Sequence, residues 1–285
     1  MPTLRVVFFG EDSFSAAVVR AIIDAGYEVA LIATPFYENK LYKRLESTAQ
    51  EFDIPFVRQE DIHSKEFVNL VGVFKPDLIV TAHFEKLLRR ELISIPTLGC
   101  INLHPSLLPL YRGMSPQHWP IINGDRETGV TIHFIEEGID TGNIVVQKRV
   151  PVAEHVYVAD LQRQMLPVYK EAILEALTLL EAGYQGVDQD IASGSFYGRF
   201  KRVHAELNPM DSATRAYNLI RAASKPYIGA RFGNVCIWKA EPLDAAEENI
   251  FFKQLNSIGF HTFGVENSYL VLNDGILRVS KFEYI

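Results

Sequence analysis

The first part of the chain (residues 4–82) alternates short apolar runs with longer segments of helical periodicity, and this alternation constrains the fold most. Residues 4–10 (LRVVFFG), 28–34 (EVALIAT) and 77–82 (DLIVTA) are almost wholly apolar, as expected of strands buried on both faces of a parallel sheet. A further short strand is expected at 54–57. Helical segments of about 10 to 15 residues separate these strands, so the connections should be right-handed crossovers. The pattern predicts an α/β protein with a doubly wound parallel sheet.

Helix signals fill the segments between these strands. After the first strand, Asp12 or Ser13 can cap a helix that Gly26 ends. Further helices are expected at 41–52 and 67–74. The apolar positions of the first helix recur at helical spacing: Phe14, Ala17, Val18, Ala21 and Ile22.

The pattern changes after Gly99. The strand expected at 101–104 runs into a proline-rich stretch (HPSLLPLYRGMSP) and not into a helix, so a rigid irregular loop is expected there. Residues 130–135 and 144–152 alternate between apolar and polar, which is typical of a more exposed, antiparallel hairpin that flanks the sheet. A long helix at 161–180 then closes the first domain.

The C-terminal part has a different character. Residues 184–204 carry several glycines and polar residues and are expected to form a linker. Asp211 is expected to cap a helix at 214–223, and short strands separated by glycine turns follow from residue 230. The sequence therefore predicts an α/β domain at 1–183 and a small, partly open β-barrel at 205–285.

Composition narrows the class of partner and the compartment. The chain has 285 residues and a formal net charge of −7, whereas a protein that coats nucleic acid needs a concentrated basic surface. Cys100 and Cys236 are too few for a disulfide framework. The sequence contains neither a signal-peptide pattern nor an apolar run long enough to span a membrane. We expect a cytoplasmic protein with a small-molecule partner and no membrane partner.

Three polar residues are expected at the carboxyl edge of the sheet, where doubly wound folds bind their ligands. Asn102 and His104 are two residues apart and so share one face of their strand, and Asp140 lies in a glycine-flanked loop (GIDTG). Attack by an amine on an acyl carbon needs an amide for the oxyanion, an imidazole for the proton, and a carboxylate that orients the imidazole and raises its pKa. Each residue alone also has a structural explanation: a satisfied histidine, a turn cap or a tight loop.

Two other ligand classes lack their usual signals. Only one glycine follows the first strand (FFGEDSFS), so GxGxxG is absent and a dinucleotide is not expected. His83, His104, His118 and His133 lack the paired spacing of zinc ligands, and no metal site is expected.

The stretch from Asn102 to residue 142 (NLHPSLLPLYRGMSPQHWPIINGDRETGVTIHFIEEGIDTG) resembles the formyltransferases that use 10-formyltetrahydrofolate, the sugar N-formyltransferases and methionyl-tRNA formyltransferases among them. The start (RVVFFG) is similar to the first strand of that family, and residues 208–232 are similar to the start of the C-terminal barrel of its long members. The resemblance implies that Asn102, His104 and Asp140 are the catalytic trio. It also implies that the first domain is a Rossmann-like, doubly wound α/β domain and that the C-terminal domain is OB-like.

The resemblance further implies where the formyl donor binds. Loops at 84–88 and 135–140 correspond to those that hold the folate in this family, and neither has a folate signature of its own. From residue types alone, their apolar members would be core residues or a hydrophobic lip. The residues expected to contact 10-formyltetrahydrofolate are Phe84, Lys86, Leu87, Leu88, Ile135, Glu137, Gly138 and Ile139.

The acceptor amine is the least constrained part of the prediction. A tRNA enzyme needs many basic residues for phosphates, but basic and acidic residues are nearly balanced over 201–285, so tRNA is disfavoured. The loop PFYENKLYKRLES also lacks the long basic insertion of the tRNA enzymes that the chain resembles. We expect a primary amine on a nucleotide-linked amino sugar, such as a dTDP- or UDP-4-amino-deoxysugar. The expected contacts are Tyr111, Arg112, Gly113 and Trp119, where an aromatic ring and a guanidinium suit a base and a diphosphate.

Other readings stay open at this stage. Methionyl-tRNA and N-hydroxyornithine are alternative acceptors, and a non-catalytic folate- or RNA-binding protein is an alternative from a different class. The intact trio favours an enzyme. The small-acceptor relatives are often dimers, so a homodimer is also expected.

Overall fold

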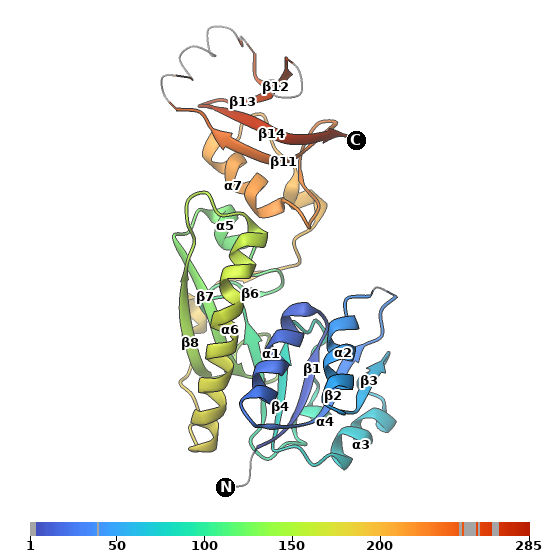
Figure 1. Ribbon diagram of the computed structural model, residues 1–285. Coiled ribbons are helices and arrows are strands. Elements are labelled where there is room, and N and C mark those ends of the chain that lie inside the picture. Colours follow the sequence, from blue (N-terminus) through green and yellow to red (C-terminus); the bar gives the residue numbers. More distant parts are fainter. Residues whose placement is uncertain (1–3, 39, 245–246, 248–254, 256, 264–267) are drawn as a thin grey trace. The chain divides into compact units, whose positions relative to one another are not determined.

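The computed structural model describes residues 4–38, 40–244, 247, 255, 257–263 and 268–285 (Figure 1). The chain forms two compact units, each built from several segments. The first unit contains Met1–Gly113, Gly129–Val150 and Gln164–Phe196, and the second contains Met114–Thr128, Pro151–Arg163 and Tyr197–Ile285. The segment at 35–47, which lacks the long basic insertion of the tRNA enzymes, includes residue 39. This residue lies outside the described residues.

The first unit is organised around a seven-stranded sheet of order β3-β2-β1-β4-β5-β7-β8. The first five strands in this order pair in parallel, and β5 pairs antiparallel with β7. The strand order reverses between β1 and β4, which is the arrangement of a doubly wound α/β fold. The strands are β1 (Arg5–Gly10), β2 (Glu28–Pro35), β3 (Phe56–Gln59), β4 (Leu78–Ala82), β5 (Cys100–His104), β7 (Glu127–Phe134) and β8 (Ile144–Pro151).

Helices follow the strands as the apolar periodicity predicts. Asp12 caps α1 by accepting from the backbone N–H groups of Phe14 and Ser15, which confirms one of the two predicted caps. The face of the sheet that carries Val7 and Phe9 packs against α3 and α4. The helices are α1 (Ser13–Asp24), α2 (Lys43–Glu51), α3 (Lys65–Val73), α4 (Arg90–Ile93) and α6 (Val158–Glu181), and α6 runs beside β7 and β8 in Figure 1.

The hairpin that was expected to be exposed is partly buried. β7 pairs antiparallel with β5 and lies between β5 and β8, inside the sheet. Val130, Thr131 and Ile132 are all fully buried. The alternation of apolar and polar residues in β7 therefore does not indicate a solvent-facing surface, because neighbouring elements cover its polar side chains as well.

The described part of the second unit contains helices and an antiparallel sheet. Among its helices are α5 (Trp119–Asn123) and α7 (Ala213–Ala223), and its sheet has the order β10-β11-β14-β13-β12. The partly open barrel stays a prediction, because no pairing of β10 with β12 is found in the described part of the chain. The strands are β10 (Ala230–Phe232), β11 (Val235–Pro242), β12 (Gly259–Thr262), β13 (Ser268–Val271) and β14 (Ile276–Tyr284).

The predicted cap of α7 was wrong by one residue. Ser212, not Asp211, is the N-cap and accepts from the backbone N–H of Arg215. The carboxylate of Asp211 instead accepts from the backbone N–H of Asn208 and pairs with the side chain of Arg215. Serine and aspartate are equally good N-cap residues, so the sequence alone does not show which of two adjacent candidates starts the helix, and the local turn geometry decides.

The segment expected to be a linker carries short elements: the 3₁₀ helices η1 (Ile191–Ser193) and η2 (Arg202–Ala205), and the strand β9 (Phe196–Tyr197), which pairs with β6 (Arg112–Gly113). In the described residues, no helix has the length and apolar character needed to cross a membrane.

Candidate active site

Three neighbouring strands bring polar side chains together around Asn102. In the sheet register, Asn102 of β5 lies opposite Thr81 of β4 on one side and His133 of β7 on the other. The Thr81 hydroxyl donates to Asn102 Oδ1 at 2.7 Å, and Asn102 Nδ2 lies 3.2 Å from His133 Nε2. His133 Nδ1 donates to the backbone carbonyl of Phe134 at 2.8 Å, and this bond turns Nε2 toward the Asn102 amide. This arrangement fixes the Asn102 amide and leaves its second N–H for a ligand.

The protonation site of His104 follows from its hydrogen bond. Its Nε2 lies 2.9 Å from the backbone carbonyl of Tyr111, which can only accept, so Nε2 carries a hydrogen. Nδ1 is therefore the nitrogen that gains or loses a proton, and it lies 3.6 Å from Asp140 Oδ2. Burial lowers the pKa of His104 and outweighs the opposing effect of Asp140. Asp140 does raise the pKa of this imidazole, as expected, but burial lowers it by more because His104 is almost fully buried.

Asp140 is held as a carboxylate. Burial alone would raise its pKa, but His104, His133 and the N–H of Gly113 hold the pKa well below its usual range. The Gly113 N–H donates to Oδ2 at 2.8 Å, and His133 Nε2 lies 3.4 Å from Oδ1. The carboxylate thus stays charged and faces both imidazoles.

The glycines of the GIDTG loop are required by close approaches. A Cβ on Gly142 would lie 2.1 Å from the carbonyl oxygen of Phe134, and one on Gly138 would lie 2.1 Å from Oγ1 of Thr141. Asp140 itself has a φ of +52°, a left-handed conformation that aspartate tolerates better than most residues. The Gln189 amide donates to the carbonyls of Asp140 and Gly142 and holds this backbone in place.

A cavity of about 690 Å³ opens beside these residues. It is lined by Thr81, Asn102, His133 and Asp140, and by all eight residues expected to contact the donor. Its volume lies within the range of small-molecule sites. The eight are Phe84, Lys86, Leu87, Leu88, Ile135, Glu137, Gly138 and Ile139.

The residues expected to contact the acceptor fall into two groups. Tyr111 and Gly113 supply the backbone groups that hold His104 and Asp140, and the Arg112 N–H donates to Ser195 O at 3.0 Å. Trp119 belongs to the second unit. Its indole N–H donates to Met114 O at 3.2 Å, and its ring stacks on Tyr197 at a centroid distance of 4.6 Å.

Sequence reasoning missed Thr81 and His133. His133 was considered only as a zinc ligand, and in the described residues no group of His, Cys, Asp and Glu is arranged to hold a metal. The signal for both residues is the register of β5 against its two neighbours, since residues directly opposite in a sheet lie on the same face. The pairing of β5 with β7 was not considered from the sequence, because residues 130–135 were expected to form an exposed hairpin that flanks the sheet.

The comparisons with known proteins agree with this geometry. The sequence model of the formyl transferase family matches residues 4–177. The chain is 31% identical over 253 residues to a methionyl-tRNA formyltransferase of Clostridioides difficile, covering 85% of this chain and 81% of that protein. A methionyl-tRNA formyltransferase of Thermotoga maritima is also 31% identical, over 81% of this chain and 77% of that protein.

Solved structures share the fold over nearly the whole chain. WlaRD, a sugar 3N-formyltransferase with dTDP and 5-N-formyl-tetrahydrofolate, matches with a TM-score of 0.73 at 20% identity, covering 97% of each chain. An N-formyltransferase of Helicobacter canadensis with folinic acid and dTDP-3-aminofucose matches with a TM-score of 0.74 at 20% identity, covering 99% of this chain and 100% of that one. The family match and the two relatives show that this chain belongs to the formyl transferase family and is a formyltransferase.

Proposed function

We propose that this enzyme transfers a formyl group from 10-formyltetrahydrofolate to a primary amine, with Asn102, His104 and Asp140 as its catalytic residues. One observation carries the proposal: the cavity that exposes Asn102 and Asp140 is also lined by every residue expected to contact the donor. WlaRD and the Helicobacter canadensis enzyme were solved with formylated folates, which supports this donor.

The cavity has groups that suit both ends of a folate. Leu87 and Ile139 are exposed apolar side chains at its wall, 65% and 40% exposed, and offer cover for a flat ring. Lys86, Arg89 and Arg90 line the same cavity and suit the carboxylates of a glutamate tail. Folate binding would bury the apolar side chains of the cavity wall and pair its basic side chains with the carboxylates of the glutamate tail.

In this proposal each catalytic residue has its own part in the reaction. The donor supplies a formyl group on N10, and the amine forms a bond to its carbon. Asn102 donates its free Nδ2–H to the oxygen that becomes negative. His104 Nδ1 accepts the proton that the amine loses, and Asp140 stabilises the resulting imidazolium. When the bond from the formyl carbon to N10 breaks, His104 returns its proton to N10. The N-formylated acceptor and tetrahydrofolate then leave, and His104 is neutral again.

We propose a nucleotide-linked amino sugar as the acceptor. The net charge of −7 disfavours a long polyanion, and the structural likeness to two enzymes with dTDP or a dTDP-amino sugar extends over nearly the whole of each chain. In this proposal the C-terminal unit is OB-like, the enzyme is a cytoplasmic homodimer, and Tyr111, Arg112, Gly113 and Trp119 serve the acceptor.

Methionyl-tRNA is the second candidate, and one observation favours it. Relatives named methionyl-tRNA formyltransferase are 31% identical over more than four fifths of this chain, whereas the sugar enzymes are 20% identical. The donor, the cavity and the catalytic residues are the same in both proposals.

The acceptor can be identified by direct assay. The purified chain is incubated with 10-formyltetrahydrofolate and, separately, dTDP-, UDP- and GDP-amino sugars, N-hydroxyornithine and methionyl-tRNA, and formylated product is measured by mass. Product with an amino sugar alone supports the first proposal, and product with methionyl-tRNA alone replaces it with the second. Asp140→Asn is the inactive control, and Asp24→Asn, which alters an exposed carboxylate on α1, is the matched active control.

A further inference from the structure

A second cavity lies wholly within the second unit. It has a volume of about 260 Å³, and none of its lining residues takes part in the proposed formyl transfer. Its wall combines basic and aromatic side chains on β11, β14, α6 and the end of α7. The lining residues are Tyr157, Ala159, Asp160, Ser224, Lys225, Trp238, Lys239 and Lys281.

An irregular strand pairing places two adjacent residues on this cavity. Neighbours in a regular strand point to opposite faces, yet Trp238 and Lys239 both line the wall. The register of β11 against β14 shifts on both sides of Lys239, which is the effect of β-bulges. Bulges are known to redirect side chains, and here the result is an indole and an ammonium group at one site.

The same pairing sets like charges against each other. Lys239 and Lys281 are direct cross-strand partners, an arrangement that destabilises a sheet. Asp160, the carboxylate in the lining, is paired with Arg163. None of the ion pairs found among the described residues involves Lys225, Lys239 or Lys281. A concentrated positive charge is therefore retained on a chain whose net charge is −7.

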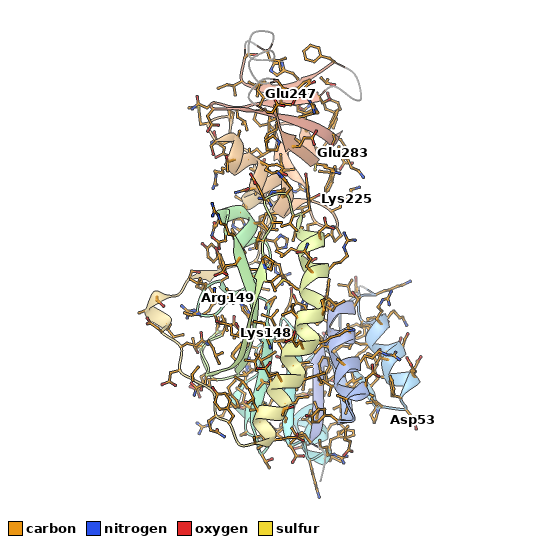
Figure 2. All side chains as sticks on the ribbon, turned by 60° about the vertical axis from the view of Figure 1, so that its left-hand side comes forward. Asp53, Lys148, Arg149, Lys225, Glu247 and Glu283 are labelled. Carbon is orange, nitrogen blue, oxygen red and sulfur yellow. The ribbon has the colours of Figure 1, made fainter. Side chains whose placement is uncertain are left out.

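The aromatic part of the wall is rigid and has an unused donor. The Lys225 ammonium lies 5.0 Å from the centre of the Trp238 ring, and Figure 2 labels Lys225 on the second unit. The Trp238 backbone carbonyl accepts from the Ser224 hydroxyl at 2.6 Å. The indole Nε1 is buried and has no acceptor in the part of the chain that the structure describes. Tyr157 is fixed by hydrogen bonds with both backbone groups of Ala240, and burial raises its pKa to about 12, so it adds no negative charge.

We propose that this cavity binds a nucleoside phosphate, with the phosphates on Lys239, Lys281 and Lys225 and the base against Trp238. Among the described residues the three ammonium groups have no carboxylate partner, which suits a phosphate, and the part of the Trp238 ring that lines the same wall offers a base apolar contact. The cavity, about 260 Å³, is too small for a longer nucleic-acid chain. The site is independent of the acceptor proposed above, because no catalytic residue lines it.

Binding is tested with the full-length protein by equilibrium dialysis against dTDP, UDP, pyrophosphate and thymidine. The nucleotides and pyrophosphate are expected to bind, and thymidine at least about tenfold more weakly, because it lacks the charged groups. Lys239→Gln and Lys281→Gln should each weaken dTDP binding about tenfold, and the loss should shrink at high salt. Lys148→Gln removes the same charge at a lysine that already pairs with Glu171 and Glu175, and it should change nothing (Figure 2).

A second measurement locates the ligand without altering the cavity. The chain has two tryptophans, so Trp119→Phe leaves Trp238 as the single indole reporter. Nucleotide binding should change its fluorescence with the same Kd as in dialysis. Equal dTDP affinity in Trp119→Phe alone and in combination with Lys239→Gln or Lys281→Gln, measured by Trp238 fluorescence, would overturn the proposal, as would binding of RNA oligonucleotides with no binding of dTDP or UDP. These outcomes do not depend on formyl transfer, which is assayed separately and should persist in both lysine variants.

Discussion

Each unit of the molecule contains a buried histidine that donates to a backbone carbonyl, but the surroundings of the two rings differ. In the first unit, His104 donates through Nε2 to Tyr111 at 2.9 Å. In the second, His118 donates through Nδ1 to Ala222 at 2.8 Å. Burial lowers the pKa of both rings. By burial and backbone hydrogen bonding alone, the two histidines are alike.

The difference lies in what the rest of each ring faces. His104 has a carboxylate, Asp140, 3.6 Å from its second nitrogen. His118 is stacked on Phe200 at 4.8 Å and meets the edge of Tyr227 at 4.3 Å. A proton on His104 can be stabilised by the adjacent carboxylate, whereas the His118 ring packs against the rings of Phe200 and Tyr227. A buried histidine therefore indicates chemistry only when its second nitrogen has a partner for the charged form.

The largest expected difference between the two rings is in catalysis. His104→Asn and Asp140→Asn should each lower kcat about 10³-fold, or roughly 4 kcal/mol, because the proton acceptor or its counter-charge is lost. The double variant should be little worse than either single variant, since the two residues act together. Steady-state assays with a saturating donor measure the effect. His118→Asn is the matched variant and should retain kcat within about threefold per folded molecule. An equal loss of kcat in the His104 and His118 variants would contradict a catalytic role that is specific to His104.

The pH dependence of the reaction sharpens the same contrast. His104 must be neutral to accept the amine's proton, and burial lowers its pKa below the ordinary value of about 6.5. Activity should therefore persist below that pH and then fall about tenfold per unit, or about a hundredfold over two units. A plot of log kcat/KM against pH measures this acidic fall in activity. The pKa of the acceptor amine is determined separately, so that its own protonation can be subtracted. A limb centred above 6.5 would contradict a neutral, desolvated His104.

His118 should affect stability where His104 affects rate. Burial lowers the pKa of His118 to about 4, below the unfolded value of about 6.5, so only the unfolded chain takes up this proton between those values. The contribution is fully present above pH 6.5 and is lost as the pH falls toward 4. From pH 7 to 5 the free energy of unfolding of the second unit should fall by about 2 kcal/mol from this group.

Urea unfolding at the two pH values measures the loss, with fluorescence as the signal because both tryptophans lie in the second unit. In His118→Gln this part of the pH dependence should disappear. His155→Gln, which alters an exposed histidine of the same unit, should leave it intact. An unchanged pH slope in His118→Gln would show that other groups cause the acid sensitivity.

The sequence carried much of the first unit's fold. The apolar runs of β1, β2 and β4 could be predicted because a central parallel strand must be apolar on both faces, and each run matches a strand to within one residue. The burial of β7 could not be predicted, because alternation does not reveal whether neighbouring strands cover the polar positions. The helix α7 was predicted, but two adjacent capping residues left its first turn ambiguous.

The candidate site divides in the same way. The motif identified Asn102, His104 and Asp140, since those side chains belong to one recognisable stretch. The orientation of Asn102 could not be predicted, because it depends on Thr81, twenty-one residues away in the chain, and on the register with His133. The protonation site of His104 depends on a carbonyl at Tyr111, a backbone group that has no sequence signal.

The smallest expected effect tests whether a buried hydroxyl matters for its partner or only for its burial. Thr81 and Thr128 are both almost fully buried, but Thr81 donates to Asn102, and the Thr128 hydroxyl has no partner among the described residues. Thr81→Val should lower kcat about tenfold with KM little changed, because the Asn102 amide loses the bond that directs its free N–H. Thr128→Val should leave kcat unchanged and leave stability equal or higher, since a buried, unpaired polar group is removed. Steady-state kinetics and urea unfolding of both variants compare them directly. Equal kcat losses at the two positions would mean that Thr81 acts through packing and that Asn102 is oriented by His133 alone.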